Sequence, residues 1–87
     1  MEFKGTKGEW VKNNTGSEVE TLAGDRICTL IQGIKTSNEQ KANAKLIAAA
    51  PDLLSNLIRC VDRLDENGLG QMYAVKRAKE AINKALN

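Results

Sequence analysis

The sequence predicts an α+β protein: a three-stranded antiparallel β-meander followed by three α-helices, in two layers with the helices over one sheet face. Three observations carry this prediction. Short runs of β-forming residues, separated by turn residues, occupy residues 9–34. Apolar residues at helical spacing occupy residues 38–86. The only proline, Pro51, lies inside that helical part.

The first half of the chain is predicted to fold as three strands joined by tight turns. Residues 9–12 form the first strand, and the turn that follows contains asparagine and glycine, which tolerate left-handed backbone. Residues 17–22 alternate, with Val19 and Thr21 on one face, as in a half-buried strand. Residues 26–34 are apolar on both faces, so this strand is either central or contacts a partner with its second face.

Helices are predicted at about residues 38–49, 51–66 and 71–86. In each of them apolar side chains recur every three or four residues and so share one face. In the second helix they are interpreted as core and comprise Leu53, Leu54, Leu57, Ile58, Val61 and Leu64. In the third helix they comprise Val75, Ala78, Ile82 and Ala85.

Pro51 is expected to separate the first two helices. Proline has no N–H to donate, and it disfavours helical backbone at Ala50. The first helix is therefore predicted to end near Ala49, and the second to begin with Pro51 at its first position. The alternative is one continuous helix kinked at Pro51.

Composition narrows the range of functions. A chain of 87 residues predicts a single domain, residues 1–87, with a core so small that a homo-oligomer is expected. It has no histidine and no cysteine spacing typical of zinc, so we predict no catalytic residue, no metal site and no cofactor, and expect no enzyme activity. Cys28 and Cys60 are expected to be buried and reduced. No apolar run approaches the ~20 residues of a membrane span, and the start lacks a signal peptide's apolar segment, so no membrane association is predicted.

Polar residues at strand ends, turns and helix surfaces are the candidates for ligand binding. They are Trp10, Lys12, Asn13, Arg26, Asn43, Lys45, Arg59 and Arg63. Trp10 either packs against the sheet or stacks on a base. Asn43 either binds a partner or braces a neighbouring strand. The basic cluster Lys76, Arg77 and Lys79 is either a solvated face or a phosphate contact.

Residues 42–57, ANAKLIAAAPDLLSNL, resemble the pattern ANARLIAAAPELLEAL of a group of small bacteriophage and prophage accessory proteins. Members of the group start with a GPW-like segment, here Gly8-Glu9-Trp10 with glutamate in place of proline, and end in a helix rich in alanine and charge, here AVKRAKEAINKAL. The resemblance implies phage origin and the cytoplasm of a host bacterium. Such accessory proteins often act against host defences.

Three functions follow as hypotheses. The first is a non-catalytic host-defence antagonist that sequesters a small nucleotide-type immune signal. The second is an anti-CRISPR-like inhibitor that binds a host defence protein, with residues 26–34 as its docking edge. The third is a small nucleic-acid-binding protein that uses its last helix.

Overall fold

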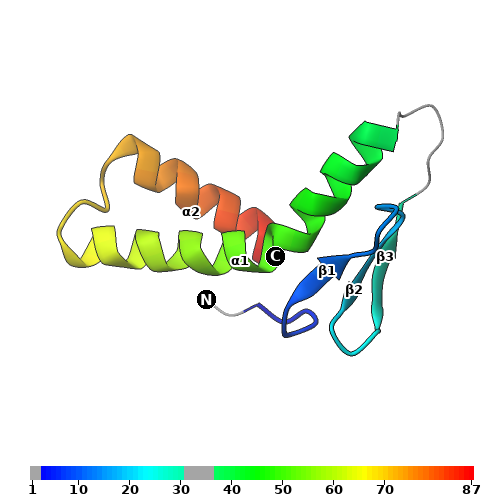
Figure 1. The fold of residues 1–87 in the computed structure, drawn as a ribbon. Coiled ribbons are helices and arrows are strands. Elements are labelled where there is room, and N and C mark those ends of the chain that lie inside the picture. Colours follow the sequence, from blue (N-terminus) through cyan, green and yellow to red (C-terminus); the bar gives the residue numbers. More distant parts are fainter. Residues whose placement is uncertain (1–2, 31–36) are drawn as a thin grey trace. The chain divides into compact units, whose positions relative to one another are not determined.

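A computed structural model describes residues 3–30 and 37–87 of the chain. The elements follow in the order β1 (Trp10–Lys12), β2 (Glu18–Thr21), β3 (Arg26–Thr29), α1 (Ser37–Glu66) and α2 (Tyr73–Leu86) (Figure 1). The α+β class and the three-stranded antiparallel sheet are confirmed. The number of helices is a correction, because the described chain has two helices where three were predicted.

The sheet is a meander with the order β1-β2-β3. Val19 and Thr21 on β2 are buried, as their alternation predicted. Of the two alternatives for the third strand, the central position is wrong for the described strand, Arg26–Thr29, which lies at the sheet edge. In a meander of consecutive hairpins the middle strand of the sequence is also the middle strand of the sheet. Leu30, also predicted in this strand, lies outside β3, and the last predicted residues, 31–34, lie outside the described residues.

The β1–β2 turn is fixed by one side chain. The Asn13 Oδ1 atom accepts hydrogen bonds from the backbone N–H groups of Ser17, at 2.9 Å, and Glu18, at 3.2 Å. Neither asparagine of the turn adopts positive φ; Gly16 does, at +73°. A Cβ atom on Gly16 would lie 3.0 Å from the Lys41 Cα atom, so glycine also allows the turn to approach α1 closely.

α1 runs without interruption through Pro51, so the predicted break is wrong and the continuous-helix alternative holds. A break would require Ala50 as the N-cap of a second helix, and alanine is among the poorest N-cap residues. No glycine near Ala49 could end the first helix in the left-handed conformation. A break would also leave helix-end carbonyl and N–H groups without partners, whereas proline removes one hydrogen bond. Continuity is therefore the less costly outcome.

The chain forms two compact units, which are described separately. The first, here the sheet unit, is Thr6–Pro51 and contains the sheet and the start of α1. Its buried residues, among those described, are Gly16, Val19, Thr21, Gln40 and Ala44. The Gln40 Oε1 atom is buried and has no hydrogen-bond partner among the described residues.

The second unit, here the hairpin unit, comprises Met1–Gly5 and Asp52–Asn87. In it the second part of α1 and all of α2 lie side by side and antiparallel (Figure 1). Val61, Val75 and Ile82 form the core, each at most 2% exposed. Leu57, Ile58, Leu64, Ala78 and Leu86 pack against them. None of the described helices is long and apolar enough to cross a membrane.

The assignment of the whole leucine stripe to the core is wrong for Leu53, which is 55% exposed. On α2, Ala85 is likewise exposed, although it was expected on the apolar stripe that faces the core. In both helices the apolar residues extend over a wider face than the one that packs on the core of the hairpin unit.

Candidate functional site

The hairpin unit carries an exposed apolar surface, which we call the hairpin face. It consists of a stripe of larger residues on α1 and a stripe of alanines on α2. The members are Leu53, Leu57, Cys60 and Leu64 on α1 and Ala74, Ala78, Ala81 and Ala85 on α2. In both stripes the residues are separated by four, three and four positions, so each stripe runs straight along its helix.

The two stripes lie on the same side of the hairpin unit. Asp65 follows Leu64, and Lys79 follows Ala78, so each charged residue lies about 100° around its helix from the stripe, in the same rotational sense. The Lys79 Nζ and Asp65 Oδ1 atoms meet at 3.0 Å between the helices. Since this ion pair occupies one side of the antiparallel pair, the two stripes occupy the other side.

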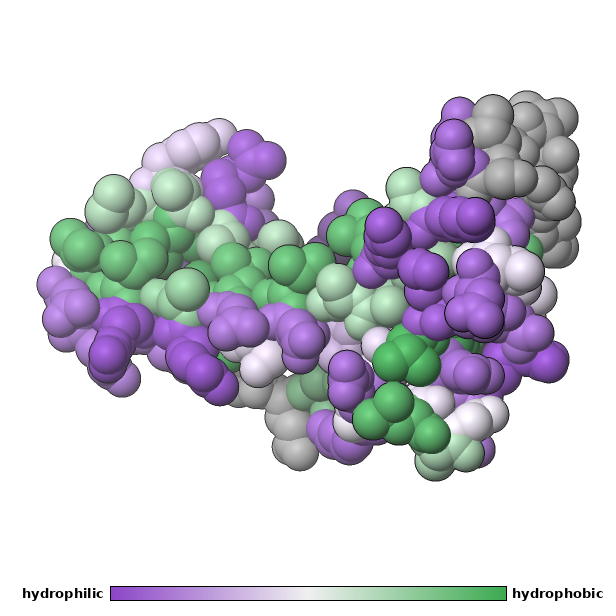
Figure 2. Space-filling view, viewed as in Figure 1, coloured by the Kyte–Doolittle hydropathy of each residue, from purple (hydrophilic) through white to green (hydrophobic). Residues whose placement is uncertain are grey.

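Much of the hairpin face is accessible. Leu53, Cys60 and three of the alanines are exposed, while Leu57, Leu64 and Ala78 are half-buried because they also pack on the core. Figure 2 shows apolar side chains gathered over α2 and the adjoining part of α1. Single exposed apolar residues are ordinary on protein surfaces, but a continuous apolar surface of this kind is typical of a contact site.

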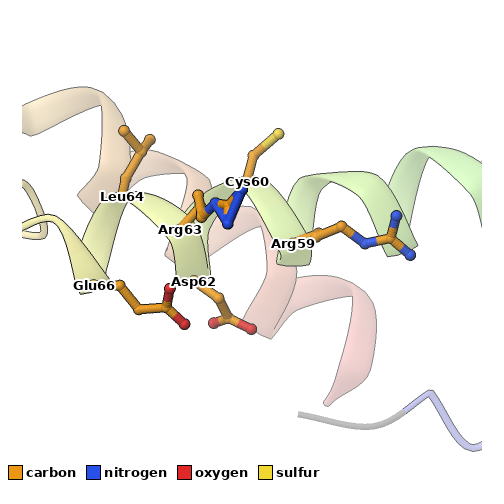
Figure 3. A pocket seen from close by; sticks show the side chains of 6 residues that line it. All are labelled: Arg59, Cys60, Asp62, Arg63, Leu64 and Glu66. Carbon is orange, nitrogen blue, oxygen red and sulfur yellow. The ribbon is translucent and has the colours of Figure 1, made fainter.

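An open depression borders the hairpin face on α1. Its lining residues are Arg59, Cys60, Asp62, Arg63, Leu64 and Glu66. Figure 3 shows Cys60 and Leu64 on one side of the helix and Asp62 and Glu66 on the other. The depression therefore joins an apolar side to a charged side that carries both signs of charge. Of the predicted ligand-binding residues, Arg59 and Arg63 come together here.

Three other predicted ligand-binding residues lie on the sheet. Trp10 is half-buried on β1, and its indole N–H donates to the Thr6 carbonyl at 3.2 Å. Lys12 lies on the same strand and pairs across the sheet with Val19. Arg26, on β3, forms an ion pair with Glu18 at 2.7 Å. The contacts of Trp10 and Arg26 orient these side chains within the sheet unit.

Asn43 and Lys45 are exposed on the first part of α1. The Asn43 side chain makes no hydrogen bond to another described residue, so the alternative in which it braces a strand is not formed there. The Asn13 side chain, by contrast, makes four hydrogen bonds within the β1–β2 turn, one each with Thr15 and Glu18 and two with Ser17.

The basic cluster on α2 is partly engaged in contacts with its neighbours. Arg77 donates from Nη1 to the Tyr73 hydroxyl at 2.9 Å and lies over that ring, 5.7 Å from its centre. Arg77 also approaches Glu80, at 3.6 Å. Lys79 pairs with Asp65 on the polar side of the hairpin unit.

Cysteine and carboxylate groups do not cluster in the described parts of the chain. Both cysteines are free; Cys28 is half-buried, but Cys60 is exposed, contrary to the expectation that both are buried. Residues 3–30 and 37–87 contain no group of three His, Cys, Asp or Glu side chains placed to hold a metal ion.

Comparison with known proteins identifies the family. A family model described as Salmonella phage P22 protein Y8K6 matches residues 1–87, the full length of the sequence. The chain belongs to this family. Phage origin, which the resemblance of residues 42–57 implied, is thereby confirmed. No curated protein and no solved structure matches the chain significantly.

The sequence contained a signal for the hairpin face of this phage protein. The spacing of four, three and four residues is that of a coiled-coil seam, which is narrower than the face of a helix buried in a globular core. Leu53 and Cys60 belong to this seam and are exposed, whereas Leu57 and Leu64 are half-buried. Spacing alone was read as core because most apolar stripes are buried.

Proposed function

We propose that this phage protein is a non-catalytic accessory protein that acts by binding other molecules, and that the hairpin face is its protein-contact surface. One observation carries the proposal: Leu53, Cys60 and the exposed alanines form a continuous apolar surface with no cover from the described chain. A protein partner would remove this surface from water, which stabilises a complex by ~25 cal/mol per Å² of apolar area.

The biological role we propose is antagonism of a host defence system in the bacterial cytoplasm. Phage origin supports this role. The inhibitor hypothesis named residues 26–34 as the docking edge, and β3 is an edge strand over its described part. The hairpin face comprises eight residues, whereas the described part of that strand comprises four, so we place the main protein contact on the hairpin face.

Native mass spectrometry of the tagged full-length protein from infected cells tests the proposal. We expect the wild-type protein to carry at least one further protein subunit. Leu53→Glu places a charge on the hairpin face and should release that subunit, because burying an unpaired charge is costly. Ser55→Glu is the matched control, on an exposed position of the same helix outside the stripe. Bare monomer from wild-type cells, or equal retention by both variants, would overturn the proposal.

Capture of a small nucleotide-type immune signal is the second candidate function. It is favoured by Arg59 and Arg63, which line one depression and could pair with phosphate groups. Asp62 and Glu66 line the same depression and oppose an anionic ligand, so this candidate ranks lower.

Calorimetry with a panel of cyclic nucleotides and ADP-ribose derivatives tests the second candidate. Binding at micromolar concentration should disappear in the Arg59→Ala/Arg63→Ala variant and persist in Arg77→Ala, whose guanidinium lies over Tyr73 on α2. If no member of the panel binds at that concentration, nucleotide capture is excluded.

A further inference from the structure

The two stripes of the hairpin face differ in side-chain size and share one spacing. The stripe on α1 consists of the larger side chains Leu53, Leu57, Cys60 and Leu64, whereas the stripe on α2 consists only of alanines. A surface with a raised stripe beside a lowered one fits a copy of itself after a rotation of 180°. Such a rotation about an axis parallel to the helices places α1 of one copy over α2 of the other.

We propose that the hairpin face binds a second copy of this chain in this arrangement, forming a two-fold dimer whose centre is an antiparallel four-helix bundle. The inference rests on the proposed function, because it names the protein that contacts the hairpin face. Each copy contributes its α1 stripe and its α2 stripe, so the same contact occurs twice. This is an isologous interface, which closes at two copies.

The heights of the residues fit this dimer. α1 ends at Glu66 and α2 begins at Tyr73, so these two residues lie at one end of the hairpin unit. The height of a residue is its distance from this end along the helix axis. Cys60 lies six residues before Glu66, which corresponds on α2 to a height between Ala78 and Ala81. A rotation axis parallel to the helices leaves heights unchanged, so Cys60 of one copy would face the gap between these alanines of the other.

The remaining stripe residues follow the same rule. Leu64 lies at a height between Ala74 and Ala78, and Leu57 at a height between Ala81 and Ala85. Each larger side chain therefore meets the space between two alanine methyl groups, as a knob meets a hole in a helical bundle. In the other two-fold arrangement, α1 faces α1 and α2 faces α2. Two alanine stripes would then meet and leave unfilled space, which costs stability.

Charge complementarity also favours the arrangement in which α1 of one copy faces α2 of the other. Asp65 and Lys79 pair on the side opposite to the stripes and are left out of this count. The rest of the α1 segment 52–66 contains three acidic and two basic residues, a net charge of −1, and the rest of α2 contains three basic residues and one acidic residue, a net charge of +2. The proposed arrangement brings opposite net charges together at both contacts, whereas the other arrangement brings like charges together.

The size of the surface sets the expected affinity. Each stripe is about 17 Å long, at 1.5 Å per residue, and the helices of a pair lie roughly 10 Å apart. This surface is smaller than the ~800 Å² per partner of a typical stable interface. We therefore expect a monomer–dimer equilibrium in the micromolar range rather than a permanent dimer.

Disulfide trapping of the purified full-length protein tests the arrangement. In a Cys28→Ser background, Ala81→Cys should form a disulfide with the native Cys60 of the other copy, giving a dimer on a non-reducing gel that dithiothreitol dissolves. Asn83→Cys is the matched control, because Asn83 is exposed on α2 outside the stripe and should give no dimer. Adding Cys60→Ser to Ala81→Cys should abolish the dimer.

The trapping experiment can overturn the arrangement in three ways. A product at the monomer position only would show that no second copy faces Cys60. Equal dimer yields from Ala81→Cys and Asn83→Cys would show random collision. Dimers through Cys60 alone, in the Cys28→Ser protein without a second change, would show α1 facing α1.

Analytical ultracentrifugation over a concentration series provides the second test. The wild-type protein and Ser55→Glu should dimerise, and Leu53→Glu should lose at least tenfold in affinity. The dimer should weaken as salt is raised, because the interface joins opposite charges; an increase with salt would contradict it. If the pure protein stays monomeric but carries a host subunit when taken from infected cells, the dimer fails and the proposed function stands. If both experiments show a bare monomer, both fail.

Discussion

The sheet unit and the hairpin unit differ in the kind of side chain that they bury. Among the described residues of the sheet unit, the buried ones include the polar side chains of Thr21 and Gln40, and the first turn is held by hydrogen bonds to Asn13. The hairpin unit buries only the apolar side chains Val61, Val75 and Ile82 and leaves leucines and alanines exposed beside them.

The difference indicates which unit depends on association. The hydrogen bonds that hold the first turn of the sheet unit are made within that unit, although the buried Gln40 Oε1 atom has no partner among the described residues. A pair of helices covers one face of each helix, so a sequence with wider apolar faces leaves apolar area in water. The hairpin unit therefore gains most from a partner, while the sheet unit depends on its own turn geometry.

Ile82→Ala should have the largest effect, and it tests the apolar side of the comparison. Ile82 is fully buried in the core of the hairpin unit, and truncation of such a residue costs about 2–5 kcal/mol through lost burial and the cavity left behind. Urea unfolding followed by circular dichroism at fixed protein concentration measures the loss. Asn83→Ala, at the next and exposed position, should change stability by less than about 0.5 kcal/mol. Equal effects of the two substitutions would mean that burial of Ile82 in this core does not stabilise the hairpin unit.

Pro51→Ala acts where the two units join. Alanine restores the N–H that can donate to the Ile47 carbonyl and removes the ring from the helix interior, so stability should rise by up to about 3 kcal/mol. Thermal unfolding measures the change. Ser55→Ala, an exposed position on the same helix, should raise stability by no more than about 0.7 kcal/mol through helix propensity alone. A neutral or destabilising Pro51→Ala would instead indicate a helix that starts at Pro51.

The sequence predicted the elements that depend on local rules. These are the turn at Asn13 and Gly16, the alternation of Val19 and Thr21, and the last helix, predicted at about residues 71–86 and observed at Tyr73–Leu86; all of them rest on interactions within a few residues of each other. These were found close to the expected positions.

The features that depend on competing costs were not predicted correctly. Pro51 is unfavourable inside a helix, but the termini of two separate helices would be worse without a good cap at Ala50. Whether Leu53 is exposed depends on which other parts of the fold pack against α1, and the spacing of apolar residues along the sequence does not show this. The candidate site was missed because Leu57 and Leu64 belong both to this stripe and to the face that packs on the core, and because Cys60 was expected to be buried.

Asn13→Ala tests the polar side of the comparison and should cost about 1–3 kcal/mol. Its Oδ1 atom accepts two backbone hydrogen bonds in a half-buried turn, and alanine leaves both donors without a partner. Asn14→Ala is the matched control, because Asn14 is exposed and adjacent. Backbone hydrogen exchange at Ser17 and Glu18 should accelerate in Asn13→Ala and stay unchanged in Asn14→Ala. Unchanged exchange in both would show that the turn is held by other contacts.

Asp65→Asn should have the smallest effect. The Asp65–Lys79 ion pair has a length of 3.0 Å, but its side chains are 39% and 41% exposed, and pairs of this kind contribute about 0–1 kcal/mol. A double-mutant cycle with Lys79→Met isolates the pairwise term, which should shrink in high salt. Because the pair lies on the side of the hairpin unit opposite to the stripes, Asp65→Asn should leave disulfide trapping through Ala81→Cys unchanged. A loss of trapping would place this ion pair and the dimer contact on one surface, and the two sides of the hairpin unit would not be distinct.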